Sequence, residues 1–354
     1  DTLRTMELRL RHASPDITVF EFSGHLRIGD ALIAAENSIR RSVEEGARKE
    51  GKVSIVHTLR GELGANHLEI FRKRYPFIKV DLNVDIGSQD AAERLVAEET
   101  TRRHLTDVIT IALPDGVEPV RRNFVARYPT PAIKAIYPQF AQSNDPEHRW
   151  VTFYWSEHGI SYNSNLVPPD KAPKDWFDLC DPFFKGNVSF DPAEARYLAG
   201  LHSIMGLEGT EKFLKCIGAN DPIVQRGHSQ RTELMLAGDH MAQGDNYLYY
   251  GLQLQKKNPS LPYANVYTGA IMYNLGVNMI NRNAANPHAS ALFTDWTLSR
   301  ESQQYLSDEG RGPVALKHPY MPDSVTLVAT VDPPKEIADK LMGFWRTYVE
   351  KRGR

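Results

Sequence analysis

Arginine residues occupy three short loops that each lead into an expected helix. They are Arg60 in HTLRG, Arg196 in DPAEARY and Arg231 in GHSQRTE. A guanidinium group grips a carboxylate or a phosphate at two points, and a helix start adds backbone N–H donors. Each arginine alone is typical of a solvated surface, whereas three on such loops favour an anion site. Hydroxyl donors lie on loops of the same kind, at Thr58, Ser88 and Ser229.

The segment GDNYLYY offers a different chemistry. Asp245 can accept a hydrogen bond from a ligand amine or hydroxyl, with Tyr247 packed beside it. The alternative for Asp245 is to cap the helix expected to begin at Tyr247. Asp191 opens the DPAEARY loop, and His228 lies in the GHSQRTE loop, where an ordinary loop histidine is the simpler interpretation. All four residues are therefore candidate ligand contacts.

Motifs for catalysis or for a bound cofactor are absent from the sequence. It has no phosphate-binding glycine loop with lysine, no nucleophile elbow, no HExxH and no CxxC. We therefore predict that the chain is not an enzyme and needs no cofactor, with an enzyme built on some other arrangement as an alternative. Cys180 and Cys216 are too few for a zinc or iron–sulfur site. An exported protein can join them, but two thiols are the simpler interpretation.

The clearest of the elements that must position these residues runs from Gly51 to Asp81. The apolar run Val53–Val56 predicts a buried strand, and a helix with an apolar face follows and ends before Pro76. Alternating apolar residues over 78–84 predict a second strand. This unit is a right-handed crossover, and its ligand end is the loop His57–Gly61, after the first strand.

Further elements follow from the same patterns. We expect strands at 16–22, 105–113, 149–162, 187–190 and 268–280, and helices at 30–50 and 334–351. The strand at 16–22 either extends a sheet edge or mediates self-association, so the role of residues 1–30 and the oligomeric state stay open. Tyr154 and Trp155 are candidates for a cleft wall. Successive strand residues face opposite ways, so at least one of the aromatic residues 153–155 should pack into the core.

Composition excludes several classes of protein. The 354 residues are 41% hydrophobic and 24% charged, as in a soluble globular protein of two ordinary lobes. The formal net charge of −2 does not support a nucleic-acid partner. No apolar run approaches the length of a membrane span.

Four blocks of the sequence resemble segments of a known family, and they occur in the same order. They are ARKEGKVSIVHTL with LEIFRKRYPFIKVDL, then YNSNLVPPDKAPKDWFDLC, TELMLAGDHMAQGDNYLYY and TGAIMYNLGVNMINRN. Together they resemble periplasmic solute-binding proteins of bacterial ABC importers, in the extracellular solute-binding family 1 and ferric-iron-binding group. The resemblance covers roughly residues 40 to 320. It implies an α/β type II periplasmic binding fold, with two lobes, a mostly parallel sheet flanked by helices in each, and a ligand cleft between them.

The resemblance also implies how the chain is divided. Residues 1–50 are expected to be an N-terminal extension with a helix on the first lobe. The first lobe is expected to comprise 51–152 and 270–312, and the second 153–269 and 313–354, with hinges near 152–158 and 268–272. It further implies a periplasmic protein whose signal peptide has been removed.

Iron-binding members of the family hold Fe(III) with two adjacent tyrosines, a histidine and a glutamate. Tyr247 matches the first tyrosine, but Leu248 replaces the second. The position of the glutamate falls near Ala112. The histidine is expected near Gly61, with His57 just before it. A ferric site would therefore rest on Tyr247 and His57, and iron is the alternative rather than the first choice.

The resulting prediction is capture of a small ligand without turnover. The preferred ligand is a small organic anion, such as a carboxylate, a phosphonate or a phosphate ester, with an amino or aromatic part in some cases. The implied partners are an inner-membrane ABC permease and its ATPase. A ligand sensor that signals to a receptor is a further alternative.

Overall fold

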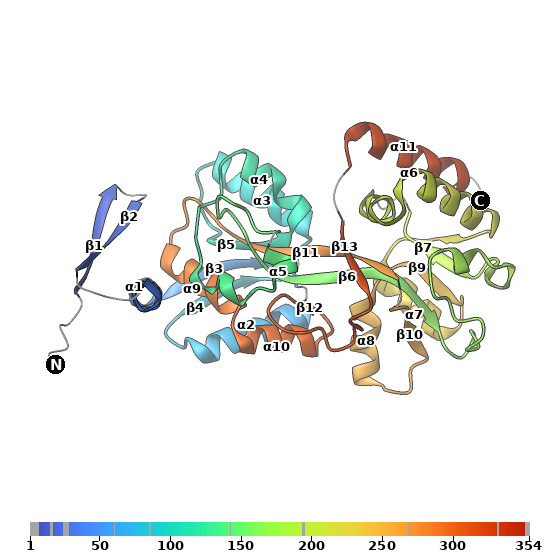
Figure 1. Cartoon of the computed structure of the whole chain (residues 1–354), viewed down its shortest axis with the longest axis horizontal. Helices are drawn as coiled ribbons and strands as arrows, with labels where there is room; N and C mark the ends of the chain where they lie inside the picture. The colour runs from blue at the N-terminus through green and yellow to red at the C-terminus, as the bar shows by residue number, and fades with distance from the viewer. Residues whose placement is uncertain are drawn as a thin grey trace.

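The computed structural model describes residues 7–14, 17–23, 28–59, 61–84, 86–141, 143–192, 195–267, 269–330 and 333–350. Across these residues an eleven-stranded mixed sheet runs through two lobes, with the main strand order β4-β3-β5-β11-β6-β9-β7-β8 (Figure 1). Helices flank the sheet in both lobes (Figure 1). The predicted α/β fold class with two lobes is confirmed.

The first lobe is built on three parallel strands, β3 (Lys52–His57), β4 (Lys79–Asn83) and β5 (Val108–Ala112). Its helices include α2 (Gly61–Arg74), α3 (Ser88–Thr100) and α9 (Pro287–Thr297). Leu68 and Phe71 of α2 are fully buried, and the helix ends two residues before Pro76, as the apolar spacing and the proline predict. The crossover unit expected between Gly51 and Asp81 is therefore confirmed.

The second lobe repeats this plan with β7 (Val188–Phe190), β8 (Ile223–Val224) and β9 (Ala242–Tyr247), again in parallel. The helices α6 (Ala195–Ala219), α7 (His228–Ala237) and α8 (Leu248–Lys257) follow these strands. The C-terminal helix α11 (Lys335–Tyr348) packs on α6 and buries Trp345 in the same core as Phe190 and Phe213. The helix expected at 334–351 thus lies on the second lobe, as predicted.

Two long strands, β6 (Val151–Asn163) and β11 (Ala270–Ile280), cross from one lobe to the other (Figure 1). They pair antiparallel over most of their length, with Met272 opposite His158 and Asn278 opposite Val151. β11 also pairs with β5, and β6 with β9, so each crossing strand belongs to one sheet as well as to the connection. Almost all of their residues are buried.

Shorter elements complete the connection between the lobes. β12 (Gly312–Pro313) and β10 (Tyr263–Asn265) pair with β6, and β13 (Thr326–Ala329) pairs with β11. The helix α10 (Arg300–Asp308) lies between α2 and β12. The remaining short helices in the described residues are η1 (Leu113–Gly116), α4 (Val117–Arg121), η2 (Pro131–Ala135), α5 (Pro138–Ala141), η3 (Phe177–Cys180) and η4 (Pro182–Phe184).

The N-terminal part adds a hairpin and a helix in front of the first lobe. β2 (Ile17–Ser23) pairs with β1 (Glu7–Ser14), and neither pairs with the main sheet. The first residue of the predicted strand, Asp16, lies outside the described residues. α1 (Ile28–Glu50) confirms the helix expected at 30–50 and lies against α9. A Cβ atom at Gly46 would lie 2.3 Å from the His288 ring, so glycine permits this close approach.

Cys180 and Cys216 form a disulfide between η3 and α6. The interpretation as two thiols was therefore wrong. The two residues are 36 positions apart in sequence, and only the packing of η3 against α6 brings their Cα atoms to 5.7 Å.

Within the described part of the chain, no helix is both long and apolar enough to cross a bilayer. The expected limits of the two lobes within the sequence stay a prediction.

The disulfide predicts a measurable loss of stability on reduction. Replacing both Cys180 and Cys216 by serine should lower the free energy of unfolding by about 2–4 kcal/mol, because the bridge restricts the unfolded chain. Urea unfolding with and without a reductant measures the change. The wild type should lose stability in the reductant, whereas the double variant should not respond. Equal urea midpoints for all four samples would contradict the bridge.

Candidate ligand-binding site

A cavity of about 700 Å³ lies between the two lobes. It is lined by residues that come from both lobes and from the crossing strands: Thr58, Leu63, Ser88, Ala112, Tyr154, Ser156, Arg196, Gly227, His228, Ser229, Gln230, Tyr247, Tyr249, Tyr250, Gln253, Asn274, Leu275 and Arg311. None of these residues is an aspartate or a glutamate. Among the described residues, the wall of this cavity therefore offers cations, hydroxyls and aromatic rings but no carboxylate.

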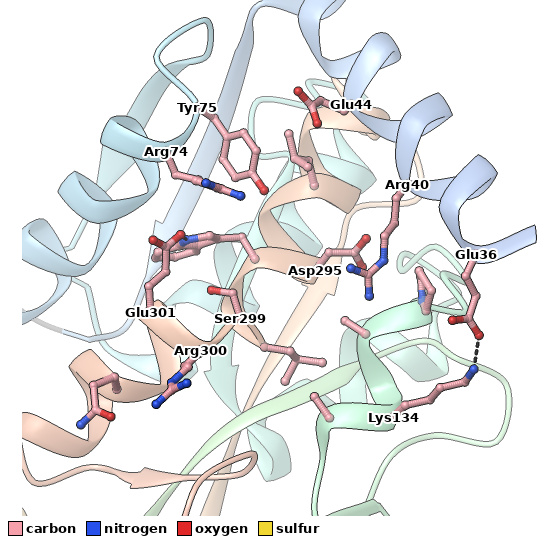
Figure 2. A pocket seen from close by; sticks show the side chains of 17 residues that line it. Glu36, Arg40, Glu44, Arg74, Tyr75, Lys134, Asp295, Ser299, Arg300 and Glu301 are labelled. Atoms are coloured by element: carbon pink, nitrogen blue, oxygen red, sulfur yellow. Dashed lines mark hydrogen bonds and ion pairs between the residues drawn. The ribbon is translucent and has the colours of Figure 1, made fainter. Parts of the chain in front are cut away.

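A second cavity of about 900 Å³ lies between α1, η2 and the α9–α10 corner of the first lobe (Figure 2). Four acidic and four basic side chains line it: Glu36, Glu44, Asp295, Glu301, Arg40, Arg74, Lys134 and Arg300. Lys134 forms an ion pair with Glu36. This balanced lining favours neither sign of ligand charge, and the cavity touches only one lobe. The interlobe cavity is therefore the candidate site.

Strand ends and helix starts converge on the interlobe cavity. Thr58 follows β3 and donates from Oγ1 to the Thr110 carbonyl at 2.7 Å, while Ser88 begins α3 and accepts from the Ala112 N–H at 2.8 Å. On the second lobe, opposite Thr58 and Ser88, Arg196 lies in the first turn of α6, and the start of α7 from Gly227 onward also lines the cavity. Ligands of open α/β sheets bind at this end of the strands, where helix N-termini favour negative charge.

Among the described residues that line the cavity, Arg311 is the arginine that forms no ion pair. Its side chain is 8% exposed, and its Nη1 donates to the Ser156 hydroxyl at 2.7 Å. Its guanidinium group stacks on Tyr249 at 3.5 Å from the ring centre, with Tyr154 5.4 Å away. Nε has no hydrogen-bond acceptor, and no carboxylate among the described residues forms an ion pair with Arg311. A buried guanidinium without a counter-charge is a strong site for an anion.

Tyr154 owes its position in the cavity to a glycine on the neighbouring strand. Gly276 of β11 is the register partner of Tyr154 on β6. A Cβ atom at Gly276 would lie 1.9 Å from the tyrosine ring. The absent side chain lets the ring lie over β11 beside Arg311.

Arg196 also lines the cavity, but its charge is already compensated. It forms an ion pair with Asp115 of η1, which belongs to the opposite lobe. This pair joins the lobes across the cleft. The structure therefore places Arg196 at the junction of the lobes, and any contact with a ligand would compete with Asp115.

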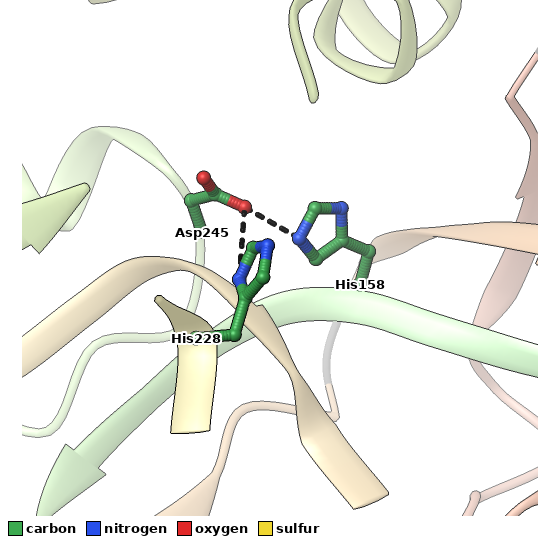
Figure 3. Close-up of side chains that lie close together, drawn as sticks. All are labelled: His158, His228 and Asp245. Atoms are coloured by element: carbon green, nitrogen blue, oxygen red, sulfur yellow. Dashed lines mark ion pairs between the residues drawn. The ribbon is translucent and has the colours of Figure 1, made fainter. Parts of the chain in front are cut away.

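His228 of the second-lobe wall forms a cluster with His158 and Asp245, which are buried behind it (Figure 3). His158 pairs with Asp245, whose side chain is fully buried, and the His228 Nδ1 lies 4.0 Å from the Asp245 Oδ1. Arg231 is equally buried, with Nη2 3.9 Å from Asp245 Oδ2 and 2.7 Å from the Asp245 carbonyl oxygen. Burial alone would raise the pKa of Asp245, but the adjoining His158, His228 and Arg231 hold it below its ordinary value.

Two histidines and a carboxylate are a common ligand set for transition metals, and their ligand atoms lie within 4.8 Å of one another. Arg231 argues against a metal here. Its Nη2 donates to the His228 Nδ1 at 3.0 Å, which occupies the lone pair that would bind the metal. It also places a positive charge beside the only carboxylate of the set. The arrangement fits a compensated charge network that holds the cavity wall.

Several predicted site residues lie in the cavity wall, and others do not. Thr58, Ser88, Tyr154, Arg196, His228, Ser229 and Tyr247 line the cavity, and their roles in binding stay predictions. Arg60 lies outside the described residues. Arg231 and Asp245 are buried behind the wall, and the partly exposed Asp191 accepts from the Gly227 N–H at 2.9 Å and donates from its own N–H to Asp245 at 3.2 Å. Asp245 is not the N-cap of α8, because α8 begins at Leu248 with Tyr247 in that position, and the Asp245 carboxylate bonds to the Asp191 N–H and pairs with His158.

Trp155 and His57 are corrections to the predicted set. Trp155 faces away from the cavity, because it alternates with Tyr154 along β6, and it packs between Phe140 and Tyr273. His57 is the last residue of β3 and is fully buried beneath the loop. Its Nδ1 lies 2.5 Å from the Thr110 hydroxyl and its Nε2 3.1 Å from His67, so it belongs to the first-lobe core.

Four lining residues were not predicted from the sequence: Arg311, Ser156, Tyr249 and Asn274. Ser156 and Asn274 lie on the crossing strands, where polar residues break otherwise apolar runs and give a weak signal. Arg311 follows α10 in the tetrapeptide GRGP, which reads as an ordinary turn. Nothing in that turn indicates that its arginine reaches a cavity between two lobes.

The sequence itself matches a known family over more than half of its length. Residues 118–333 match the family described as bacterial extracellular solute-binding protein. The chain belongs to this family. It is therefore a solute-binding protein and not an enzyme, and its general role is that of the periplasmic solute-binding component of an ABC transporter. No curated protein sequence matches the chain significantly.

Solved structures of periplasmic binding proteins share the fold of this solute-binding protein. Iron-bound HitA from Pseudomonas aeruginosa has a TM-score of 0.66 at 17% identity, covering 84% of this chain and 99% of its own. AfuA from Actinobacillus pleuropneumoniae with fructose 6-phosphate has a TM-score of 0.67 at 20% identity, covering 85% and 99%. The spermidine/putrescine-binding protein PotD from Streptococcus pneumoniae has a TM-score of 0.68 at 16% identity, covering 86% and 99%. At these identities the likeness shows the fold and not the ligand.

The position of His57 predicts a loss of stability in mild acid. Burial, with a smaller contribution from the Arg311 charge, lowers the pKa of His57 from 6.5 to about 3. Below pH 6.5 the unfolded chain binds a proton at His57 that the folded protein excludes. The free energy of unfolding therefore keeps its full value above pH 6.5 and declines as the pH falls towards 3. At about pH 5 the loss is ~2 kcal/mol for this residue. Urea unfolding at neutral and acidic pH measures it.

A pair of variants separates His57 from the other histidines. His57→Gln should reduce the difference in unfolding free energy between neutral and acidic pH by about that amount. His148→Asn, at an exposed position, should leave the difference as in the wild type. An unchanged pH dependence in His57→Gln would contradict this account of the buried ring.

Proposed function

We propose that this solute-binding protein captures a small organic anion in the interlobe cavity and delivers it to an inner-membrane ABC permease with its ATPase. The observation that carries the proposal is Arg311, a buried guanidinium with an unoccupied Nε and no carboxylate counterpart in the described residues. A carboxylate, a phosphonate or a phosphate ester would supply the missing charge and accept two hydrogen bonds from the guanidinium edge.

The size and lining of the cavity support an organic ligand. A volume of about 700 Å³ is in the range of sites for drug-sized molecules and far exceeds a single small anion. Four tyrosines, Tyr154, Tyr247, Tyr249 and Tyr250, line it and offer aromatic faces and hydroxyls. An aromatic or sugar part of the ligand fits this lining. An amino part receives no support, because the described lining contains no carboxylate. The fructose 6-phosphate of AfuA belongs to the favoured chemical class.

Closure of the two lobes is the proposed means of capture. The crossing strands β6 and β11 connect the lobes and provide the hinge, and Arg196 with Asp115 joins the lobes across the cleft. A ligand that touches both lobes stabilises the closed form by its higher affinity for that form. The alternative is that a receptor, and not a permease, binds the closed form. The protein would then be a ligand sensor with the same site.

Ferric iron is the second candidate, and its support is the iron-bound relative HitA together with Tyr247 in the cavity wall. Fe(III) prefers phenolate and carboxylate oxygens. The described lining supplies tyrosines but no carboxylate, and His57, the expected histidine ligand, is enclosed in the first-lobe core. The organic anion therefore has the stronger case.

A thermal-shift screen tests the proposed ligand class. The metal-free protein is heated with fructose 6-phosphate, citrate, phosphonoacetate, spermidine or ferric citrate. A ligand present at about 100 times its dissociation constant adds ~2.7 kcal/mol to the unfolding free energy, so an organic anion should raise the melting temperature by degrees. Arg311→Ala should weaken the binding of that anion about 100-fold, which corresponds to ~2.7 kcal/mol.

Arg149→Ala is the matched control for this screen. Arg149 forms an ion pair with Asp145 outside the cavity, so its removal should leave the ligand shift unchanged. A shift with spermidine alone would contradict the anion proposal. Undiminished anion binding by Arg311→Ala would contradict the role of this arginine.

The iron alternative has a spectroscopic test. If Fe(III) binds through Tyr247, the iron-loaded protein should show a visible charge-transfer band from phenolate to iron, and Tyr247→Phe should remove it. Tyr128→Phe, which alters a tyrosine bonded to Asp295 away from the cavity, should leave the band unchanged. No band in the iron-loaded wild type would eliminate this alternative.

A further inference from the structure

The segment Arg311–His318 contacts the hinge strand β6 on both of its faces. On the cavity face, Arg311 bonds to the hydroxyl of Ser156 at 2.7 Å. In between, Gly312 and Pro313 pair with β6 as the short strand β12. On the opposite face, the His318 Nε2 lies 3.2 Å from the Glu157 carboxylate. We call the segment Arg311–His318 the hinge clamp.

The clamp lies unusually close to β6 because of a glycine. A Cβ atom at Gly312 would lie 2.2 Å from the Trp155 ring, so any other residue would displace the clamp or the ring. The Trp155 Nε1–H then donates to the Pro313 carbonyl at 2.9 Å. Trp155, which was expected to face the ligand, thus fixes the clamp from the opposite face of the strand.

Gln303 of α10 joins the clamp, β6 and the end of α9 through four hydrogen bonds. Its Oε1 accepts from the N–H groups of Val314 and Ala315 at 2.8 and 3.0 Å. Its Nε2 donates to the carbonyls of Phe153 and Thr297 at 2.7 and 2.8 Å. The side chain is fully buried, so each of these bonds would be costly to lose.

The last contact of the clamp is the 3.2 Å approach of the His318 Nε2 to the Glu157 carboxylate, which is an electrostatic contact without hydrogen-bond geometry. Glu157 is fully buried, and a carboxylate in such a position requires a partner. The Tyr320 N–H donates to the His318 Nδ1 at 3.3 Å, so the ring carries a proton on Nε2, the atom that faces Glu157. The ring also lies against Trp155, with 5.1 Å between ring centres.

We propose that Glu157 and His318 are positioning residues for Arg311. Ser156 and Glu157 are neighbours on one strand and face opposite ways, so fixing Glu157 from behind fixes the Ser156 hydroxyl that orients the guanidinium. The pair lies outside the cavity lining and acts on ligand affinity through the clamp. This inference rests on the proposed function, because it assumes that Arg311 binds the anion.

Calorimetric binding of fructose 6-phosphate to the full chain is the first test. His318→Ala should weaken binding about 10-fold, because Arg311 loses its fixed orientation. Glu157→Gln keeps a side chain of the same size beside the His318 ring and should bind within about twofold of the wild type. Thr152→Val alters another fully buried residue of β6 outside the clamp, and it should bind as the wild type does.

A double variant separates positioning from general weakening of the fold. If His318 acts through the guanidinium, His318→Ala should cost less than about twofold in affinity once Arg311→Lys has replaced that group. A full 10-fold loss in the Arg311→Lys background would overturn the proposal. So would wild-type affinity in His318→Ala when Arg311→Ala has lost binding, and that result would leave the proposed function intact.

Hydrogen exchange of the ligand-free protein is the second test. It shows whether the hinge clamp stabilises β6 even if fructose 6-phosphate does not bind. His318→Ala should speed exchange of the β6 amides over residues 154–157 about 10-fold, whereas Thr152→Val should not. Unchanged exchange in His318→Ala would overturn the clamp whatever the ligand. Unaltered anion binding by Arg311→Ala would instead overturn the proposed function.

Discussion

The antiparallel pairing of β6 with β11 is the constraint on which the rest of this structure depends. Each strand pairs with a different lobe on its other edge, β11 with β5 and β6 with β9. A slip of one residue would turn every side chain to the opposite face. The register that joins the lobes therefore also decides that Tyr154 and Ser156 face the cavity while Trp155 and Glu157 face away. The hinge and the candidate site are one structural feature.

Charge compensation separates the cations around the cavity into two kinds. Arg196 is paired with Asp115 across the cleft, and Arg231 lies in the network of Asp245 and the two histidines. These two hold protein segments in place. Arg311 is buried too but meets a hydroxyl and aromatic rings instead of a carboxylate. Burial makes an uncompensated charge costly, and a bound anion would remove that cost. The favoured ligand class follows from this difference in partners.

The shared fold leaves the ligand undecided for a physical reason. HitA, AfuA and PotD have similar folds although iron, a sugar phosphate and polyamines appear in their descriptions. Sheets and helices determine where strand ends converge, whereas the loop residues at those ends determine which chemistry meets the ligand. In this chain the cavity wall also receives Arg311 from the segment after α10, a position far along the sequence from the other predicted loops.

The sequence by itself determined the elements with strong local patterns. The crossover unit from Gly51 to Asp81, the helix ending at Glu50 and the buried strands were predictable because apolar periodicity and proline act over a few residues. The ordered family blocks gave the two-lobe fold. Tertiary structure alone decided that His57 is enclosed, that Cys180 meets Cys216 and that Arg311 enters the cavity. Each of these depends on a partner distant in the chain, and local patterns carry no information about such contacts.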